Sequence, residues 1–322
     1  MRQLIFSLFC CLMFQPVLAE KDPMLNQGEQ AYLFVAIWAP NIDDQLVHQF
    51  IIEEFQNQYP DANVTPVLYR TNDVLSALMT GFAHVGITAR QWSDKEVTLL
   101  QKKYNGKKPL ELTLSADAFA IAINKDNPVR SLSIKDIQGV FSQAINDCEF
   151  NSVNDWKQLG VESLGDGQST KLAAYSYKSD ARTTKVFNNL LCGENMAQQL
   201  ESKSDALSKV ESEVNAVTFV PFNIEEMPES FVAIKDFGGK EIPARLDTVF
   251  SGEYPLSTVY YLQVAPFALD NESIKLYMDY LLDENTQSLL QEKGFARLPE
   301  QIILRNKVKM NQVKPVFANG YR

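Results

Sequence analysis

Four short polar segments carry side chains that could hold an anion. They are Ala39-Pro40-Asn41, Arg70-Thr71-Asn72, Thr88-Ala89-Arg90 and Lys178–Thr184, and each follows an apolar run of strand type. Three of them lead directly into predicted helices, whose first backbone N–H groups and positive dipole end favour a negative charge. The cations and hydroxyls in or beside these segments are Arg70, Arg90, Lys178, Arg182, Thr71, Thr88, Ser179, Thr183 and Thr184. The pattern predicts an anion-binding site built from several loops.

The same residues also have an ordinary structural explanation, which stays open. Ser, Thr, Asn and Asp before a helix most often cap its free N–H groups, and exposed cations commonly form local ion pairs or remain solvated. Asp43, Asp73 and Asp180 favour this alternative, because an acid at a helix start occupies the N–H groups and repels an anion. An anion site is therefore indicated by the shared arrangement of the four segments and by no single residue among them.

Alternating strands and helices position these segments. Apolar runs predict strands at 31–38, 63–69 and 84–89, separated by a helix at 43–59 and a short helix that opens at 71–73 and ends at Gly81. This β-α-β-α-β order predicts an α/β fold with a parallel sheet, and ligands bind beyond the carboxyl ends of such strands. A polar helical stretch precedes residue 118. Further strands are expected at 118–124, 171–177, 215–222, 230–234 and 254–266, and further helices at 133–141, 184–192 and 274–290.

Motifs of common enzyme classes are absent from the sequence. It contains no Gly-rich phosphate loop and no Gly-x-Ser-x-Gly elbow. His48, expected on the exposed face of the 43–59 helix, and His84, at the start of a strand, have no evident nucleophile partner and no metal-ligand spacing. We therefore expect a protein that is not an enzyme and that needs no cofactor or metal, with a hydrolase as the weaker alternative.

Residues 1–19, MRQLIFSLFCCLMFQPVLA, have the pattern of a cleaved signal peptide. Arg2 precedes the apolar stretch Leu4–Met13, which is too short to span a bilayer, and Val17-Leu18-Ala19 ends on a small residue. We therefore predict a soluble chain exported to the periplasm. Removing this segment changes the formal net charge from −10 to −11, because Arg2 is its only charged residue. An acidic chain is a poor ligand for nucleic acid or anionic membranes.

Two cysteines, Cys148 and Cys192, remain after the signal peptide is removed. An oxidising compartment favours a disulfide between them. Two separate buried thiols are the alternative.

The order of several longer segments resembles the periplasmic phosphate-binding proteins of ABC transporters, within the wider two-lobed solute-binding proteins. The segments are AFAIAINKDNPVRSLSIKDIQGVFS (118–142), NDWKQLG (154–160), NAVTFVPF (215–222), YPLSTVYYLQV (254–264) and LLDENTQSLLQEKGFARLP (281–299). The resemblance implies a type II periplasmic-binding-protein fold of two lobes, each a mainly parallel sheet flanked by helices, joined by two crossing strands. The implied parts are the signal peptide (1–19), lobe I (31–118 with 256–304), lobe II (119–255) and a C-terminal tail (305–322).

The ligand loops differ from those of the family. Trp38-Ala39-Pro40-Asn41 replaces a small Gly/Ser/Thr-rich loop, and Arg70–Asp73 replaces a Gly-Ser-Gly turn. Asn72 and Arg182 add bulk where glycine would let backbone N–H groups approach a small ion closely, while arginines restore charge in a wider, fork-shaped site.

The resemblance implies a small anion, phosphate or a related ion, bound in a cleft between the lobes. The implied partner is an ABC transporter permease in the membrane. The resemblance implies a monomer that contacts this partner peripherally. A non-transport interaction or signalling protein with a degenerate cleft is the alternative. The residues expected to contact the ligand are Asn41, Thr71, Asn72, Thr88, Arg90, Ser179, Arg182 and Thr183.

Overall fold

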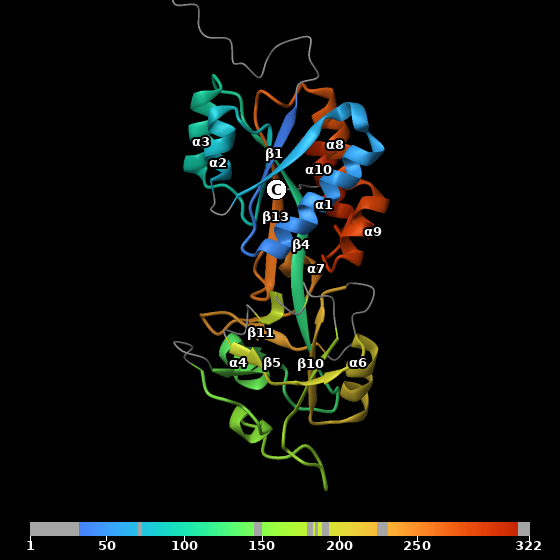
Figure 1. The fold of residues 1–322 in the computed structure, drawn as a ribbon. Coiled ribbons are helices and arrows are strands. Elements are labelled where there is room, and N and C mark those ends of the chain that lie inside the picture. The colour runs from blue at the N-terminus through green and yellow to red at the C-terminus, as the bar shows by residue number, and fades with distance from the viewer. Residues whose placement is uncertain are drawn as a thin grey trace, which may run out of the picture. The chain divides into compact units, whose positions relative to one another are not determined.

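An eight-stranded sheet, in the order β2-β1-β3-β13-β4-β10-β7-β9, organises the chain (Figure 1). The computed structural model describes residues 32–69, 73–144, 150–178, 183, 186–188, 193–223 and 231–314. The strands of the large sheet are β1 (Leu33–Ile37), β2 (Val64–Leu68), β3 (Val85–Thr88), β4 (Leu110–Ile123), β7 (Ala173–Tyr177), β9 (Gln198–Leu200), β10 (Ala216–Pro221) and β13 (Ser257–Val264). Two small sheets consist of β5 (Ser131–Ser133), β11 (Ala233–Lys235) and β12 (Glu241–Ile242), and of β6 (Ser142–Ala144) and β8 (Gly193–Asn195).

The direction of pairing changes in the middle of the large sheet. Strand β1 pairs in parallel with β2 and β3, and β7 pairs in parallel with β10 and β9. The central strands β13 and β4 are antiparallel to each other and to their outer neighbours β3 and β10. Both outer parts of the sheet are therefore parallel, and the long strands β4 and β13 connect them.

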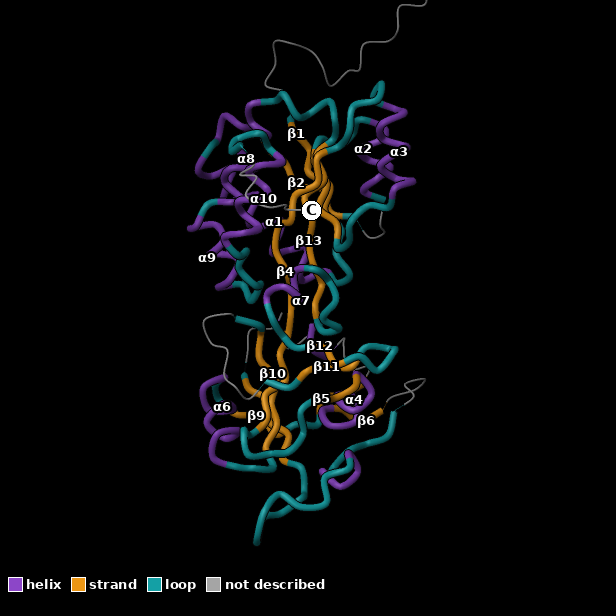
Figure 2. The backbone as a smooth tube through the Cα atoms, turned by 180° about the vertical axis from the view of Figure 1, so that it is seen from behind, coloured by secondary structure: helices purple, strands orange, loops and turns teal. Residues whose placement is uncertain are grey.

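Helices cover the large sheet from both sides. They are α1 (Ile42–Gln58), α2 (Val74–Thr80), α3 (Asp94–Lys103), α4 (Ile134–Phe141), α6 (Lys203–Ser212), α7 (Leu246–Phe250), α8 (Glu272–Leu282), α9 (Glu284–Glu292) and α10 (Glu300–Lys309), with 3₁₀ turns η2 (Pro60–Ala62) and η3 (Trp156–Leu159). Figures 1 and 2 show α2 and α3 on one side of the β1 and β13 strands, and α1, α8 and α9 on the other. Serines at the N-caps of α3, α4 and α6 form capping boxes, which satisfy the first free N–H groups of these helices. Within the described ranges, no helix is long and apolar enough to cross a membrane.

Two hydrophobic cores form along the sheet, and β4 contributes to both. The first core contains β1, β3 and the buried faces of α1 and α8, together with Leu112 and Leu114 of β4. The second core contains β7, β10 and residues 116–123, except Asp117, from the rest of β4. Strand β13 also divides its side chains, since Tyr260 lies in the first core and Tyr261 in the second. A register shift between these two tyrosines marks the change.

Most of the predicted elements are confirmed, and two are corrected. The polar helical stretch expected before residue 118 is α3, but the strand predicted at 118–124 begins earlier, at Leu110 of β4, because LELTLS places apolar side chains on alternate positions toward the first core. The predicted helix 274–290 is two helices, α8 and α9. Asp283 separates them with an extended ψ of 147° while its side chain accepts a hydrogen bond from Asn285 N.

Candidate functional site

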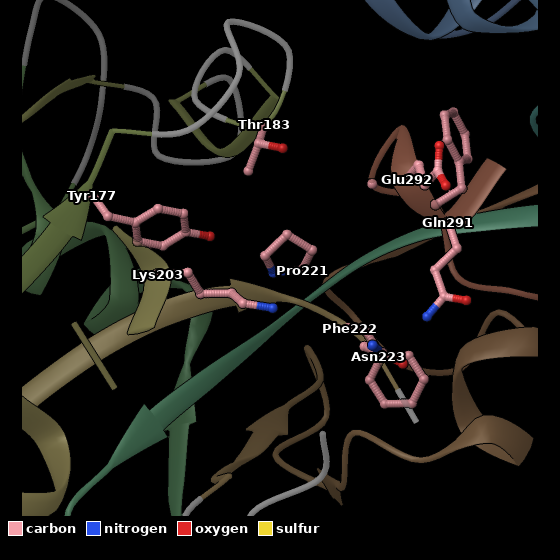
Figure 3. Close-up of a pocket in the computed structure, with 10 residues that line it drawn as sticks. Tyr177, Thr183, Lys203, Pro221, Phe222, Asn223, Gln291 and Glu292 are labelled. Carbon is pink, nitrogen blue, oxygen red and sulfur yellow. The ribbon is translucent and has the colours of Figure 1, made fainter. Parts of the chain in front are cut away.

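A pocket of about 240 Å³ opens at the carboxyl ends of β7 and β10. Figure 3 shows the Tyr177 hydroxyl, the Thr183 hydroxyl and the Lys203 amine directed into the same space, with Gln291 on the opposite side. A cation beside two hydroxyls is a chemically suitable group of donors for an oxyanion. The residues that line the pocket are Tyr177, Thr183, Lys203, Pro221, Phe222, Asn223, Gln291, Glu292, Gly294 and Phe295.

Parallel pairing of two strands brings one wall of this pocket together. Register pairs such as Thr218 with Tyr175 align β10 with β7, so both strands end on the same edge of the sheet. The Thr218 hydroxyl also donates to the Tyr175 carbonyl at 2.9 Å. Tyr177 closes β7 and Pro221 closes β10 at this edge. Ligands of open α/β sheets bind at this kind of edge.

Helix α6 delivers Lys203 to the pocket as its first residue. Ser202 caps the helix, accepting from Asp205 N at 3.1 Å. The other end of α6 is fixed to β7, because the Tyr175 hydroxyl donates to Glu213 at 2.6 Å. Burial of Tyr175, with additional effects of Glu213, raises the pKa of that hydroxyl to about 12, so it remains a donor at neutral pH. The position of Lys203 is therefore fixed by contacts at both ends of its helix.

A cluster of aromatic rings supports Tyr177 from behind. Phe187 stacks on Phe219 with ring centroids 3.5 Å apart, and Tyr177 lies 5.5 Å from Phe219. Phe119 and Phe141 complete the cluster in the second core. Such packing restricts the rotamers of Tyr177 and holds its hydroxyl at the pocket wall.

Of the predicted ligand residues that the structure describes, Thr183 lines the pocket, whereas Asn41, Thr88 and Arg90 are outside its lining. Thr88 is buried at the end of β3 and donates to the Arg90 carbonyl at 2.8 Å. Asn41 caps α1, accepting from Asp44 N at 2.8 Å. The predictions for Thr71, Asn72, Ser179 and Arg182, and for a disulfide between Cys148 and Cys192, concern residues outside the described ranges.

Two predicted cations form ion pairs with nearby acids. Arg90 donates to both carboxylate oxygens of Glu96, at 2.7 and 2.8 Å, and lowers the pKa of Glu96 to about 2 through this hydrogen bonding. Lys178 is exposed and lies 2.7 Å from both oxygens of Glu201. Pairs this exposed contribute little stability. For Arg90 and Lys178, these contacts therefore support the explanation that the cations form local ion pairs.

Residues 43–285, about three quarters of the chain, match the family model of the PBP superfamily domain. The chain belongs to the PBP superfamily. Phosphate-binding protein PstS of Pseudomonas aeruginosa is 24% identical to it over 257 residues, covering 78% of this chain and 79% of that protein. Protein SphX of Synechococcus elongatus is 23% identical over 282 residues, covering 84% and 80%.

A solved structure shares the PBP fold of this chain. The crystal structure of a possible phosphate binding protein from Planctomyces limnophilus matches with a TM-score of 0.59 and 16% identity, covering 87% of this chain and 97% of that one. At this identity the likeness concerns the fold. The α/β, type II periplasmic-binding-protein fold predicted from the sequence is confirmed.

A buried polar cluster of this PBP domain connects Asn41, at the end of the first predicted ligand segment (residues 39–41), to the pocket wall. Asp44 Oδ2 accepts hydrogen bonds from the Asn41 amide at 2.7 Å and from the Tyr260 hydroxyl. His48, one turn after Asp44, packs its ring 4.8 Å from Tyr260 and 5.4 Å from Phe295, which lines the pocket. The expected exposure of His48 is wrong: its exposed fraction is 1%, because α1 packs against β13 on that side.

The sequence-based prediction did not include Tyr177, Lys203 or Gln291. The sequence identifies Tyr177 as the last residue of a strand. The Ser202-x-x-Asp205 spacing, which precedes a segment with helical hydrophobic periodicity, marks the start of α6. No local signal places Gln291 of α9 beside these residues. Among the described residues, no cluster of three or more His, Cys, Asp or Glu side chains could hold a metal.

Proposed function

We propose that this protein is the solute-binding component of an ABC transporter and that it binds phosphate or a related small anion without chemical conversion. The observation that carries the proposal is the pocket at the ends of β7 and β10, where Lys203, Thr183 and Tyr177 converge in a PBP-superfamily chain. The curated relative PstS is named a phosphate-binding protein, which supports an oxyanion ligand over the interaction or signalling alternative.

In this proposal, different pocket residues supply the positive charge and the hydrogen-bond donors that recognise the anion. The Lys203 ammonium supplies positive charge, and the Thr183 and Tyr177 hydroxyls donate to the anion oxygens. Hydrogen bonds to a charged partner are roughly twice as strong as neutral ones and fix its orientation. Asn41, Thr71, Asn72, Ser179 and Arg182 are proposed to add further contacts to the ligand, with Thr88 and Arg90 shaping the loop after β3.

The proposed lobes are 31–118 with 256–304 and 119–255, which hinge on β4 and β13. These strands run through both hydrophobic cores, so a change in their bend would move one core against the other. Closure of two domains around a ligand by such a hinge is a common switching motion. The closed form is proposed to engage a permease at the periplasmic face of the membrane, after export directed by residues 1–19.

Isothermal titration calorimetry of the mature chain with inorganic phosphate, sulfate and phosphonates tests this function. We expect saturable binding that Lys203→Ala weakens, because losing a hydrogen bond to a charged group costs about 1.5–3 kcal/mol, or roughly ten- to 150-fold in Kd. Lys235→Ala on β11, outside the pocket lining, is the matched control and should leave Kd unchanged. A folded wild-type chain that gives no heat with any of these anions contradicts the proposal.

A further inference from the structure

We infer that a groove between the ends of α1, α8 and α9 is a docking site for an arginine side chain of a partner protein. This groove, of about 350 Å³, is called the α1–α8–α9 groove below. No residue lines both this groove and the anion pocket, so the inference goes beyond the proposed function and does not depend on it. The lining residues that carry the inference are Tyr59, Leu276, Asp279, Tyr280, Asp283 and Leu289.

Two helices present their negative ends to this groove. Helix α1 ends at Gln58 and α8 ends at Leu282, and neither has a basic residue in its last turn. The C-terminal end of a helix carries a partial negative charge, which a nearby cation stabilises. Helix α9 begins at the same place, but the Asp283 carboxylate already occupies its positive end by accepting from Asn285 N at 2.9 Å. The helix ends therefore favour a cation in the groove, whose lining contains no basic residue.

Acidic side chains add to this negative potential. Asp279 lies in the last turn of α8, the end of a helix that disfavours an acid, and its hydrogen-bond donor is the neutral Gln312 amide. Among the described residues, no ion pair joins Asp279, Asp283 or Glu54 to a cation. Burial, with the added effect of the Glu54 and Asp283 charges, raises the pKa of the Tyr280 hydroxyl, so these charges act on the groove wall. Acids that break a helix rule without a compensating contact are expected at functional sites.

The aromatic wall of the groove selects the kind of cation. The rings of Tyr59 and Tyr280 have centroids 6.4 Å apart and planes at 84°, so the face of one ring lies beside the edge of the other. Both rings pack on the fully buried Phe55, at 5.1 and 5.2 Å, which holds them in place. A guanidinium stacks on an aromatic face and also forms paired hydrogen bonds to a carboxylate, whereas an ammonium is a compact point charge. Rings and carboxylates together therefore favour arginine.

Apolar side chains in the same groove indicate that the arginine belongs to a protein segment. Leu276 is 37% exposed, and Leu289 is half-buried on α9. Such side chains cover the aliphatic stem of an arginine and the apolar neighbours that a protein segment brings with it. Aromatic residues and arginine are also the types enriched where proteins contact each other. A free guanidinium compound would use only the charged part of the groove.

NMR titration of the ¹⁵N-labelled mature chain tests this site. The probes are acetyl-Leu-Arg-Leu-amide, the same peptide with neutral citrulline in place of arginine, and arginine amide without the leucines. We expect the arginine peptide to give saturable shifts in residues 276–289 and to bind at least about tenfold more tightly than the citrulline peptide, which cannot form charge-assisted hydrogen bonds. Equal binding of the two peptides, or no shifts in this segment, overturns the inference. Arginine amide binding as tightly as the arginine peptide overturns the assignment to a protein segment.

Two variants test the placement. Asp279→Asn and Asp283→Asn should each weaken the arginine peptide about two- to fivefold, the range of an exposed ion pair, and leave the citrulline peptide unchanged. Asparagine keeps the cap at position 283, so the loss there reports charge. Asp94→Asn, an exposed aspartate in the first turn of α3 on the other side of the sheet, is the matched control (Figure 1). Equal weakening by the control overturns the placement. Both groove variants should bind inorganic phosphate as the wild type does, so failure of this site and failure of the proposed function are distinguishable.

Discussion

The hydrogen bond from Tyr260 to Asp44 offers a direct test of how Asn41 and the start of α1 are held. Both side chains are buried, with exposed fractions of 0% and 1%, and the same Asp44 oxygen accepts from Asn41 at 2.7 Å. The bond joins α1 to β13 next to the register shift between Tyr260 and Tyr261. Removing the hydroxyl in Tyr260→Phe leaves a buried carboxylate oxygen with one donor fewer.

The size of the effect can be estimated from these contacts. Phenylalanine keeps the ring that packs 4.8 Å from His48 and 5.6 Å from Phe295, so the packing contribution is retained. The remaining loss is one hydrogen bond to a charged group, worth about 1.5–3 kcal/mol. We therefore expect Tyr260→Phe to lower the free energy of unfolding by this amount.

Tyr277→Phe is the matched control for this prediction. Tyr277 is equally buried in the first core, and its hydroxyl has no hydrogen-bond partner among the described residues. Deleting a buried, unpaired hydroxyl should leave stability unchanged or raise it by up to about 1 kcal/mol. Urea unfolding followed by circular dichroism measures both variants, and equal m-values make the two midpoints comparable. Equal shifts of the two midpoints, or a Tyr260→Phe variant as stable as the wild type, would refute the reasoning.

Three further predictions concern local contacts. Gly86→Ala places a methyl carbon 2.2 Å from Val74 Cγ1, so it should cost about 1–3 kcal/mol in thermal unfolding, and Val74→Ala in the same chain should recover part of this loss. Arg90 lowers the pKa of Glu96 from 4.5 to about 2, so the stability from this pair is complete above pH 4.5 and is lost as pH falls through about 2; a stability profile of Glu96→Gln should lack this slope. Lys178→Ala breaks only the exposed ion pair with Glu201 and should change the free energy of unfolding in urea by less than about 1 kcal/mol. A larger loss would contradict the exposed position of Lys178.

The first part of the fold was predictable because each local signal agrees with its neighbours. The apolar strand β1, the helix cap at Asn41 and the helix-ending Gly81 all indicate the same β-α-β-α-β order. Gly81 adopts a φ of 77°, a conformation that favours glycine and ends α2 where the sequence places it. When propensity, capping and hydrophobic period agree, the secondary structure of a segment can be predicted from its sequence.

The errors arose where tertiary contacts override the local pattern. His48 lies on a helix whose apolar positions already form a stripe, so its burial depends on β13, more than two hundred residues later in the sequence. The long strand β4 begins among charged and polar residues, and its extension depends on pairing with β13 from Leu110 onward. Neither long-range contact has a signal within a short window.

The candidate site was less predictable than the fold for a further physical reason. Strand ends can be located from the sequence, but the availability of a cation depends on its acidic neighbours in space. The Ser93-x-x-Glu96 capping box places an acid near Arg90 and was readable in advance, whereas Glu201 reaches Lys178 only because β7 and β9 pair. The backbone thus determines at which edge of the sheet a ligand could bind. Local ion pairing determines which cations at that edge could contact an anion. A chain can therefore keep the PBP fold and still change its ligand, and the identity of that ligand must be sought in the side chains that line the pocket.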